Sequence, residues 1–279
     1  MPITGQIESE HATAWTRAEE CVVIAAHPDD ETAGAAWLLQ RVPTCTVIHL
    51  TDGAPIDPEL DNDAALRARA AYARLRRREA LHAMDLVRIP PERVYCLGVV
   101  DQEATFALAA LTHAIAEILE RLEPTIVAVH AYEGGHPDHD AASFVAHAAC
   151  SLLRRRGARA PLLVEMTAYH AAGGRLAIGQ FVPGSGPTEV VARLSPAERA
   201  RKREMMACFA TQAPVLANYA LDCERFRLSP RYDFARPPHP GLLHYERIGW
   251  RLSGADWRLF ACRALRELGL GGLASPAPS

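Results

Sequence analysis

The chain has 279 residues, of which 49% are hydrophobic and 23% charged, and its formal net charge is −3. This composition supplies a globular core and excludes a largely disordered chain. The near-neutral charge gives no electrostatic basis for nucleic acid as the main partner. The length fits one α/β domain with excursions better than two large domains.

Cysteine usage and the N-terminal sequence bear on the compartment. The seven cysteines are scattered, odd in number and without C-x-x-C spacing, which favours free thiols in a reducing environment. The first 20 residues are polar, without the apolar stretch of a signal peptide, and no apolar run reaches membrane-spanning length. We therefore expect a cytoplasmic protein without a membrane span.

Apolar, β-branched segments alternate with helical patterns in the first part of the chain. Strands are expected at residues 21–26, 44–50, 94–97, 125–130 and 162–168. Helices are expected between them up to 41, at 63–86, at 104–122 and over the helical pattern from 141 to about 156. Residues 51–55 have the composition of a turn. The strand and helix order predicts a Rossmann-like α/β fold, with a doubly wound, mostly parallel sheet and helices on both faces.

The pattern changes after residue 169. Two glycine-rich segments bracket strand-like pieces and predict a hairpin, and a capping box at Ser195 and Glu198 starts a helix that runs to about residue 209. Residues 213–250 look irregular, and the last helix is expected at 256–268. We expect a single domain over 1–279, with a core at about 20–215 and a C-terminal loop and helix at 216–279.

Two corners rich in histidine and carboxylate stand out. Residues 27–31 read His-Pro-Asp-Asp-Glu and residues 136–140 read His-Pro-Asp-His-Asp, and each follows a predicted strand and precedes a helical pattern. One such corner is explained by a helix cap alone. Two of them can converge at the carboxyl end of a parallel sheet, where ligands bind. So many charges are costly to bury unpaired, and a metal ion is the simplest partner.

These two corners resemble the motifs of the PIG-L/LmbE-like family of zinc-dependent de-N-acetylases. Weaker matches follow in order at residues 51–53, at 76–80, at Asp101 and at 202–212. The resemblance covers about residues 20–215. It departs from the family at Phe209, where a histidine is expected, which puts a role for this helix end in doubt, although Gln212 remains available.

The resemblance implies a hydrolase that removes the acetyl group from an N-acetylglucosamine-type sugar or glycoconjugate. Zn²⁺ would be held by His27, Asp30 and His139, with Asp29 as the general base and His136 stabilising the oxyanion. The residue types agree independently, because two histidines and one carboxylate form a common catalytic zinc set with a position open for water. Iron, cobalt or manganese remain alternatives for such donors.

Other side chains near the motifs receive provisional roles. Substrate contacts are expected from Arg76, Asp101 and Tyr132, against the alternatives of a solvated helix face for Arg76 and a simple strand end for Asp101. Asp138 is expected to cap the helix that presents His139. Glu31 is expected to orient a ligand, and three further histidines, at positions 130, 147 and 244, fit core or loop positions as well as the site.

Three functions remain open from the sequence. The first is the N-deacetylase, the second a metal-dependent amidase or esterase acting on another small metabolite, and the third a carbohydrate-binding domain without turnover. All three take a small-molecule partner and neither nucleic acid nor membrane. Because Asp29 and the three expected ligands are present together, the sequence favours an enzyme. The region 216–279 is left open as a lid, as a contact between subunits of a homo-oligomer, or as both.

Overall fold

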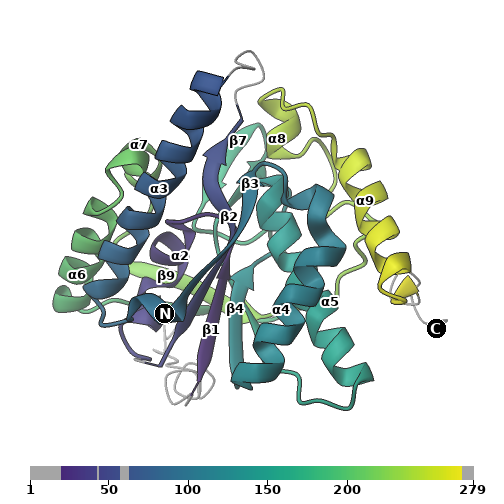
Figure 1. The fold of residues 1–279 in the computed structure, drawn as a ribbon, viewed down its shortest axis with the longest axis horizontal. Coiled ribbons are helices and arrows are strands. Elements are labelled where there is room, and N and C mark those ends of the chain that lie inside the picture. Colours follow the sequence, from purple (N-terminus) through teal and green to yellow (C-terminus); the bar gives the residue numbers. More distant parts are fainter. Residues whose placement is uncertain (1–19, 43, 57–62, 272–279) are drawn as a thin grey trace, which may run out of the picture.

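The structure is a computed structural model and describes residues 20–42, 44–56 and 63–271. Residues 1–19, in which the sequence predicts no signal segment, lie outside this range. A seven-stranded sheet runs through the centre in the order β3-β2-β1-β4-β5-β9-β8 (Figure 1). Its strands are β1 (Cys21–Ala25), β2 (Thr46–Pro55), β3 (Val94–Asp101), β4 (Ile126–His130), β5 (Leu162–Met166), β8 (Val190–Arg193) and β9 (Cys223–Leu228).

Strands β1 to β5 pair in parallel, whereas β9 runs antiparallel to β5 and β8 antiparallel to β9. A separate hairpin joins β6 (Tyr169–Ala172) to β7 (Arg175–Ile178). The main helices are α2 (Asp30–Leu39), α3 (Asp63–Asp85), α4 (Leu108–Leu122), α5 (Pro137–Arg155), α6 (Pro196–Ala207) and α9 (Gly254–Glu267), with short helices α7 (Ala213–Leu216) and α8 (His244–Arg247). The expected mostly parallel, doubly wound α/β sheet is confirmed.

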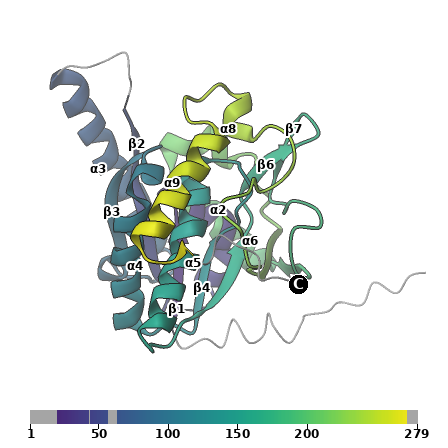
Figure 2. The same ribbon diagram turned by 90° about the vertical axis from the view of Figure 1, so that its right-hand side faces the viewer.

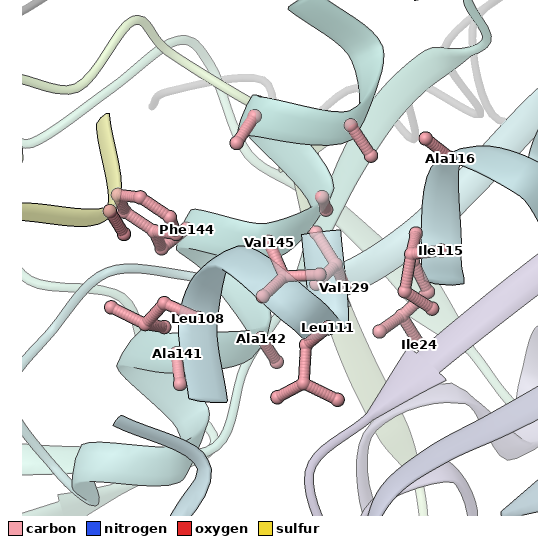
Figure 3. Close-up of a cluster of buried hydrophobic side chains, with 14 of the residues drawn as sticks. Ile24, Leu108, Leu111, Ile115, Ala116, Val129, Ala141, Ala142, Phe144 and Val145 are labelled. Atoms are coloured by element: carbon pink, nitrogen blue, oxygen red, sulfur yellow. The ribbon is translucent and has the colours of Figure 1, made fainter. Parts of the chain in front are cut away.

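The alternation of side chains along β1 builds two cores. Val22 and Ile24 face the cluster formed with α4, α5 and α9, whereas Cys21 and Val23 face the cluster formed with α2, α3 and α6. Successive strand residues point to opposite faces of a sheet, so a continuously apolar strand can be buried on both. Figure 3 shows Ile24 of β1 close to Ile115 of α4, and Val129 of β4 close to Val145 of α5, within this first cluster.

The C-terminal helix packs on the first of these cores. Figure 2 shows α9 lying against α4 and α5. Trp257 of α9 is fully buried, stacks on Tyr132 and donates its indole N–H to the carbonyl oxygen of Pro137 at 3.1 Å. This contact reaches the first turn of α5, which carries the second histidine-rich corner. Among the helices of the described residues, none has the length and apolar character needed to cross a bilayer.

Two expectations from the sequence need correction. Residues 51–55 are not a turn, because β2 continues to Pro55 and pairs irregularly with β3. Gly53 has φ +64° at this irregularity, a conformation that glycine adopts without strain. Residues 213–250 are not wholly irregular, since they contain β9. Strand β9 was not expected because its sequence is polar. Its Arg227 guanidinium lies 2.6 Å from Glu165 in a buried ion pair.

Helix α2 is kinked, and the kink is held by a buried ion pair. Ala35 has non-helical dihedrals (φ −136°, ψ 17°), so the main chain is interrupted around it. The Ala33 carbonyl accepts from Lys202 Nζ at 2.9 Å, and the Trp37 N–H donates to Glu224 at 2.9 Å. Lys202 and Glu224 bond each other at 2.7 Å. An unbroken helix would pair the Ala33 and Trp37 groups directly, so the ion pair occupies the gap in the helix.

Candidate metal and catalytic site

The candidate site lies at the carboxyl ends of β1, β3 and β4. Strand β1 leads into the corner at His27, β3 ends at Asp101, and β4 leads to the loop before α5. The chain proceeds from β1 outward through β2 and β3, then returns to the other side of β1 with β4. The site therefore occupies the point where the strand order reverses, the usual ligand position in open α/β sheets.

The expected metal ligands come together. Asp30 faces two imidazoles, with one carboxylate oxygen 3.1 Å from His27 Nδ1 and the other 3.3 Å from His139 Nε2. One ligand atom from each of His27, Asp30 and His139 can be chosen so that all three lie within 4.8 Å of one another, and all three residues are buried. Two imidazoles and one carboxylate converging in this way fit a divalent cation such as Zn²⁺.

A second group of potential ligands shares His27 and adds Asp101, His136 and Asp138. Asp138 is already occupied, because its two oxygens accept the main-chain N–H groups of Gln102 at 2.6 Å and Ala104 at 3.0 Å. Its carboxylate also lies 3.2 Å from His27 Nε2. A metal-binding histidine commonly gives its second ring nitrogen to such a carboxylate. The first group is therefore the better cation site, with Asp138 orienting His27.

The role of Asp138 differs from the expected helix cap. The residue that caps α5 is His136, whose Nδ1 accepts the Asp138 N–H at 3.1 Å. Asp138 lies two residues further along, in the first turn of α5, and its carboxylate bonds the main chain of the loop after β3. Because Nδ1 of His136 is an acceptor, the proton of the neutral ring is on Nε2. That nitrogen lies 3.9 Å from Asp101, and the ring packs edge-on against Trp250.

Asp29 adopts a strained backbone conformation at the start of α2, with φ 142°. Its N–H donates to Glu31 Oε2 at 3.0 Å, and the same oxygen accepts a hydrogen bond from His49 Nε2 at 2.9 Å. Glu31 and His49 are fully buried. A non-glycine residue in this region persists only where its surroundings hold it, and such residues gather at functional sites. Glu31 thus fixes the main chain of Asp29, and His49 is a partner that the sequence did not reveal.

Arg76 lies at the site rather than on a solvated helix face. It is 3% exposed, its guanidinium lies 3.3 Å from the Asp29 carboxylate, and it donates to the Pro28 carbonyl at 2.6 Å. A side chain at Gly53 would come within 3.1 Å of this guanidinium and 2.9 Å of the Pro28 ring. Glycine at position 53 therefore leaves room for the arginine to reach the site.

Burial and neighbouring charges shift the acidities of these groups in different directions. Burial alone raises the pKa of Asp30, but His139 and His130 outweigh it and hold that pKa well below its usual value. For Asp29, burial raises the pKa well above its usual value, although Arg76 opposes the shift. Two adjacent carboxylates thus differ strongly in basicity because only one of them faces two imidazoles.

His130 contacts two of the expected metal ligands, His139 and Asp30. Its ring stacks on His139 with centroids 4.0 Å apart and planes 6° from parallel, and its Nε2 accepts the Ala26 N–H at 3.2 Å. That nitrogen also lies 3.3 Å from Asp30. Because Nε2 is used in holding the β1 main chain, His130 orients the ligands next to it. From the sequence, His130 could be either a core residue or a residue that supports a metal ligand. In the structure it is buried and also contacts His139 and Asp30.

A pocket of about 240 Å³ opens above the metal group. The expected residues that line it are His27, Asp29, Asp30, Arg76, Asp101, His136, His139 and Gln212. Three aromatic residues that the sequence did not single out, Tyr169, Tyr219 and Trp250, also line it. They come from a hairpin and from two irregular segments, so their chain positions carry no periodic signal. Phe209 is fully buried in the core.

Tyr132 is the expected contact that the structure does not bring to the pocket. Its ring packs among Trp257, Phe234 and Tyr232, and its hydroxyl donates to the Arg236 carbonyl at 2.9 Å. Only 4% of the residue is exposed. The loop that carries it is tied to the start of α5, because Asp140 accepts the main-chain N–H groups of Glu133 and Gly134.

Part of the chain is similar to a known family. Residues 22–150 match the family model of PIG-L, described as GlcNAc-PI de-N-acetylase. The matched range holds both histidine-rich corners, Arg76 and Asp101. A comparison with curated protein sequences finds no match.

Solved structures of low sequence identity share the fold. The A40926 pseudoaglycone deacetylase Dbv21 is 19% identical with a TM-score of 0.56, covering 77% of this chain and 98% of its own. The N,N'-diacetylchitobiose deacetylase from Pyrococcus horikoshii is 16% identical with a TM-score of 0.56, covering 80% and 88%. The 4-carboxy-2-hydroxymuconate hydratase GalB from Pseudomonas putida is 16% identical with a TM-score of 0.50, covering 77% and 98%.

At these identities the structural likeness shows the fold alone, and the hydratase among them illustrates that one fold supports different reactions. The matched range contains the residues of both potential metal-binding groups. Residues 22–150, which carry both histidine-rich corners, are thus similar to the PIG-L family, whose model is described as GlcNAc-PI de-N-acetylase.

Proposed function

We propose that this protein is a metal-dependent N-deacetylase that removes the acetyl group of an N-acetylglucosamine-type sugar or glycoconjugate. The observation that carries the proposal is the convergence of His27, Asp30 and His139 beside a separately held carboxylate, Asp29. The match of this region to a de-N-acetylase family supports the same reaction.

In this proposal the metal ligands are His27, Asp30 and His139, and the native ion is Zn²⁺. When bound, such an ion supplies a Lewis acid and lowers the pKa of a coordinated water to near neutrality. Asp138 holds the ring of His27 from its second nitrogen, and His130 holds His139 by stacking. These contacts limit the rotation of both imidazoles.

Asp29 acts as the general base. Its carboxylate borders the pocket next to the ligand Asp30 and is paired with Arg76 at 3.3 Å. It takes the proton of the attacking water and later returns a proton to the leaving amine of the sugar. Arg76 holds the carboxylate of Asp29 and Glu31 holds its main-chain N–H, so that little reorganisation is needed during the reaction.

His136 stabilises the oxygen of the substrate carbonyl. Its Nδ1 is engaged by the Asp138 N–H, so Nε2 is the nitrogen that carries hydrogen and donates. Negative charge develops on the carbonyl oxygen as water attacks, and a pre-oriented donor is most effective at that stage. Asp101, with Arg76, is proposed to bind sugar hydroxyls at the pocket wall.

The proposal is tested by measuring free amine released from a panel of N-acetylglucosamine conjugates by zinc-loaded protein. Asp29→Asn is expected to lower kcat by about 10²- to 10⁴-fold while keeping the bound metal, measured by elemental analysis. Asp85→Asn, an exposed aspartate on α3, is the matched control and should retain full activity. Metal-loaded wild-type protein that releases no amine from any conjugate would overturn the proposal.

A further inference from the structure

We infer that the sugar carries an uncharged apolar group at its anomeric position, and that a second cavity beside the metal pocket binds this aglycone. The inference rests on the proposed function and narrows its substrate class. The cavity lies between the end of β2 and the N-terminal half of α3, and its volume is about 640 Å³. Cavities of this size accommodate small-molecule ligands.

The two cavities share three lining residues, Arg76, Asp101 and Gln212. They form a polar neck between the metal group and the second cavity. A guanidinium, a carboxylate and an amide are donors and acceptors suited to hydroxyl groups. The buried Arg76 Nε has no hydrogen-bond partner among the described residues. A hydroxyl of a hexopyranose in the neck could accept from it, whereas the methylene chain of a long N-acyl group would leave it unpaired, at a cost. The neck therefore favours the sugar there and the apolar group beyond it.

Apolar side chains dominate the wall beyond the neck. Pro55 and Ile56 contribute from the β2 side, and Ala65, Leu66 and Ala68 from α3. Ile56 is 46% exposed and Leu66 is 54% exposed. Single exposed apolar residues are ordinary, but these two face one cavity that opens toward the site. Covering them with an apolar ligand would remove their surface from water.

The charge in the second cavity is already neutralised. Arg69 lines it, but its guanidinium bonds the Asp52 carboxylate and the Ala54 carbonyl, each at 2.8 Å. The Tyr72 hydroxyl accepts the Gln212 amide at 2.9 Å. Among the described residues that line the cavity beyond the neck, no other cation is present to receive a phosphate or carboxylate. An uncharged aliphatic or aromatic aglycone fits this wall better than an anionic one.

The experiment compares methyl, hexyl and phenyl β-glycosides of N-acetylglucosamine, together with the methyl glycoside of N-hexanoylglucosamine. We expect kcat/KM for the hexyl and phenyl glycosides to exceed that of the methyl glycoside by about tenfold or more, through KM. Equal values for all three glycosides would overturn the inference while leaving the deacetylase intact. Preference for the N-hexanoyl substrate that depends on Leu66 would also overturn it, since the apolar group would then lie on the acyl side.

Variants separate the cavity from the reaction. Leu66→Asp should abolish the advantage of the hexyl glycoside and leave the methyl glycoside unchanged. Leu259→Asp is the control, because Leu259 is 68% exposed on α9, which lies across the sheet from α3 (Figure 1). Should no glycoside be deacetylated, the proposed function fails, and calorimetry with phenyl β-glucoside tests the cavity alone. Binding that Leu66→Asp weakens about tenfold supports the cavity, and absence of binding refutes it.

Discussion

The ion pair in the kink of α2 allows a quantitative prediction. Lys202→Met removes the ammonium that bonds both the Ala33 carbonyl and the Glu224 carboxylate. Glu224, 4% exposed, then keeps only the Trp37 N–H among the partners described here. Breaking a buried pair by removing one partner typically costs about 3–5 kcal/mol. Against a total stability of about 5–15 kcal/mol, this loss should be easily measured.

The double variant Lys202→Met/Glu224→Leu distinguishes a stranded charge from lost packing. Replacing both partners by apolar groups removes the stranded carboxylate, and such replacements are often close to neutral. The Ala33 carbonyl and Trp37 N–H remain unpaired as long as the kink persists, at about 1–3 kcal/mol for each group. We therefore expect the double variant to be more stable than the single variant and less stable than the wild type.

The assay is urea unfolding followed by tryptophan fluorescence, with ΔG in water and the slope m compared among variants. Arg201→Met on the same helix is the control, because Arg201 pairs with Glu204 in a 43% and 57% exposed ion pair. It should change stability by less than about 0.5 kcal/mol. Equal losses in the single and double variants would refute the reasoning, since the cost would then not come from the stranded Glu224.

Three further predictions concern pH, metal and the aromatic core. Burial raises the pKa of Glu133 to about 8, so the folded state holds a proton that the unfolded state releases above its lower pKa. The stability that this group contributes is fully present below its pKa in the unfolded state, and it is lost as the pH rises toward 8. Glu133→Gln should accordingly gain stability relative to wild type between pH 5 and pH 8, and parallel urea midpoints across this range would contradict the assignment. Removing metal with a chelator should lower Tm, and added Zn²⁺ should raise it again in proportion to the logarithm of the Zn²⁺ concentration. An unchanged Tm in protein shown to be metal-free would mean that the folded state does not bind the metal in preference to the unfolded state. Tyr132→Phe should cost about 1 kcal/mol by losing the bond to the Arg236 carbonyl, with KM unaltered; a raised KM without lost stability would favour substrate contact instead.

The sequence predicted the sheet and the metal group because their signals are local. Each histidine-rich corner follows a strand whose apolar residues are continuous, and the carboxyl ends of neighbouring parallel strands meet in space. The two corners could therefore be expected to meet without knowing any distance, whereas the choice of His27, Asp30 and His139 as the ligands came from the family resemblance. Arg76 was less certain, because its burial depends on Gly53 of another element.

Features that depend on partners far away in the sequence could not be predicted in the same way. Asp138 reads as a helix cap, and its actual bonds reach Gln102 and Ala104 more than 30 positions earlier. Strand β9 carries Arg227, which looks solvated until its pairing with Glu165 is known. Tyr132 precedes a glycine pair typical of a pocket rim, yet its ring completes an aromatic core contributed largely by the C-terminal region.

The bonds of Asp138 constrain the loop after β3 at the neck, whereas the wall of the second cavity on α3 is free of this constraint. Any change in the main chain at Gln102 and Ala104 would disturb the carboxylate that also holds His27, so altered substrate choice on that side would compromise the metal centre. The outer turns of α3 do not hold a metal ligand in place, and Leu66 and Ala68 are exposed there. Diversification toward new aglycones, by natural drift or by directed evolution, should therefore accumulate on α3 while the loop after β3 stays nearly invariant.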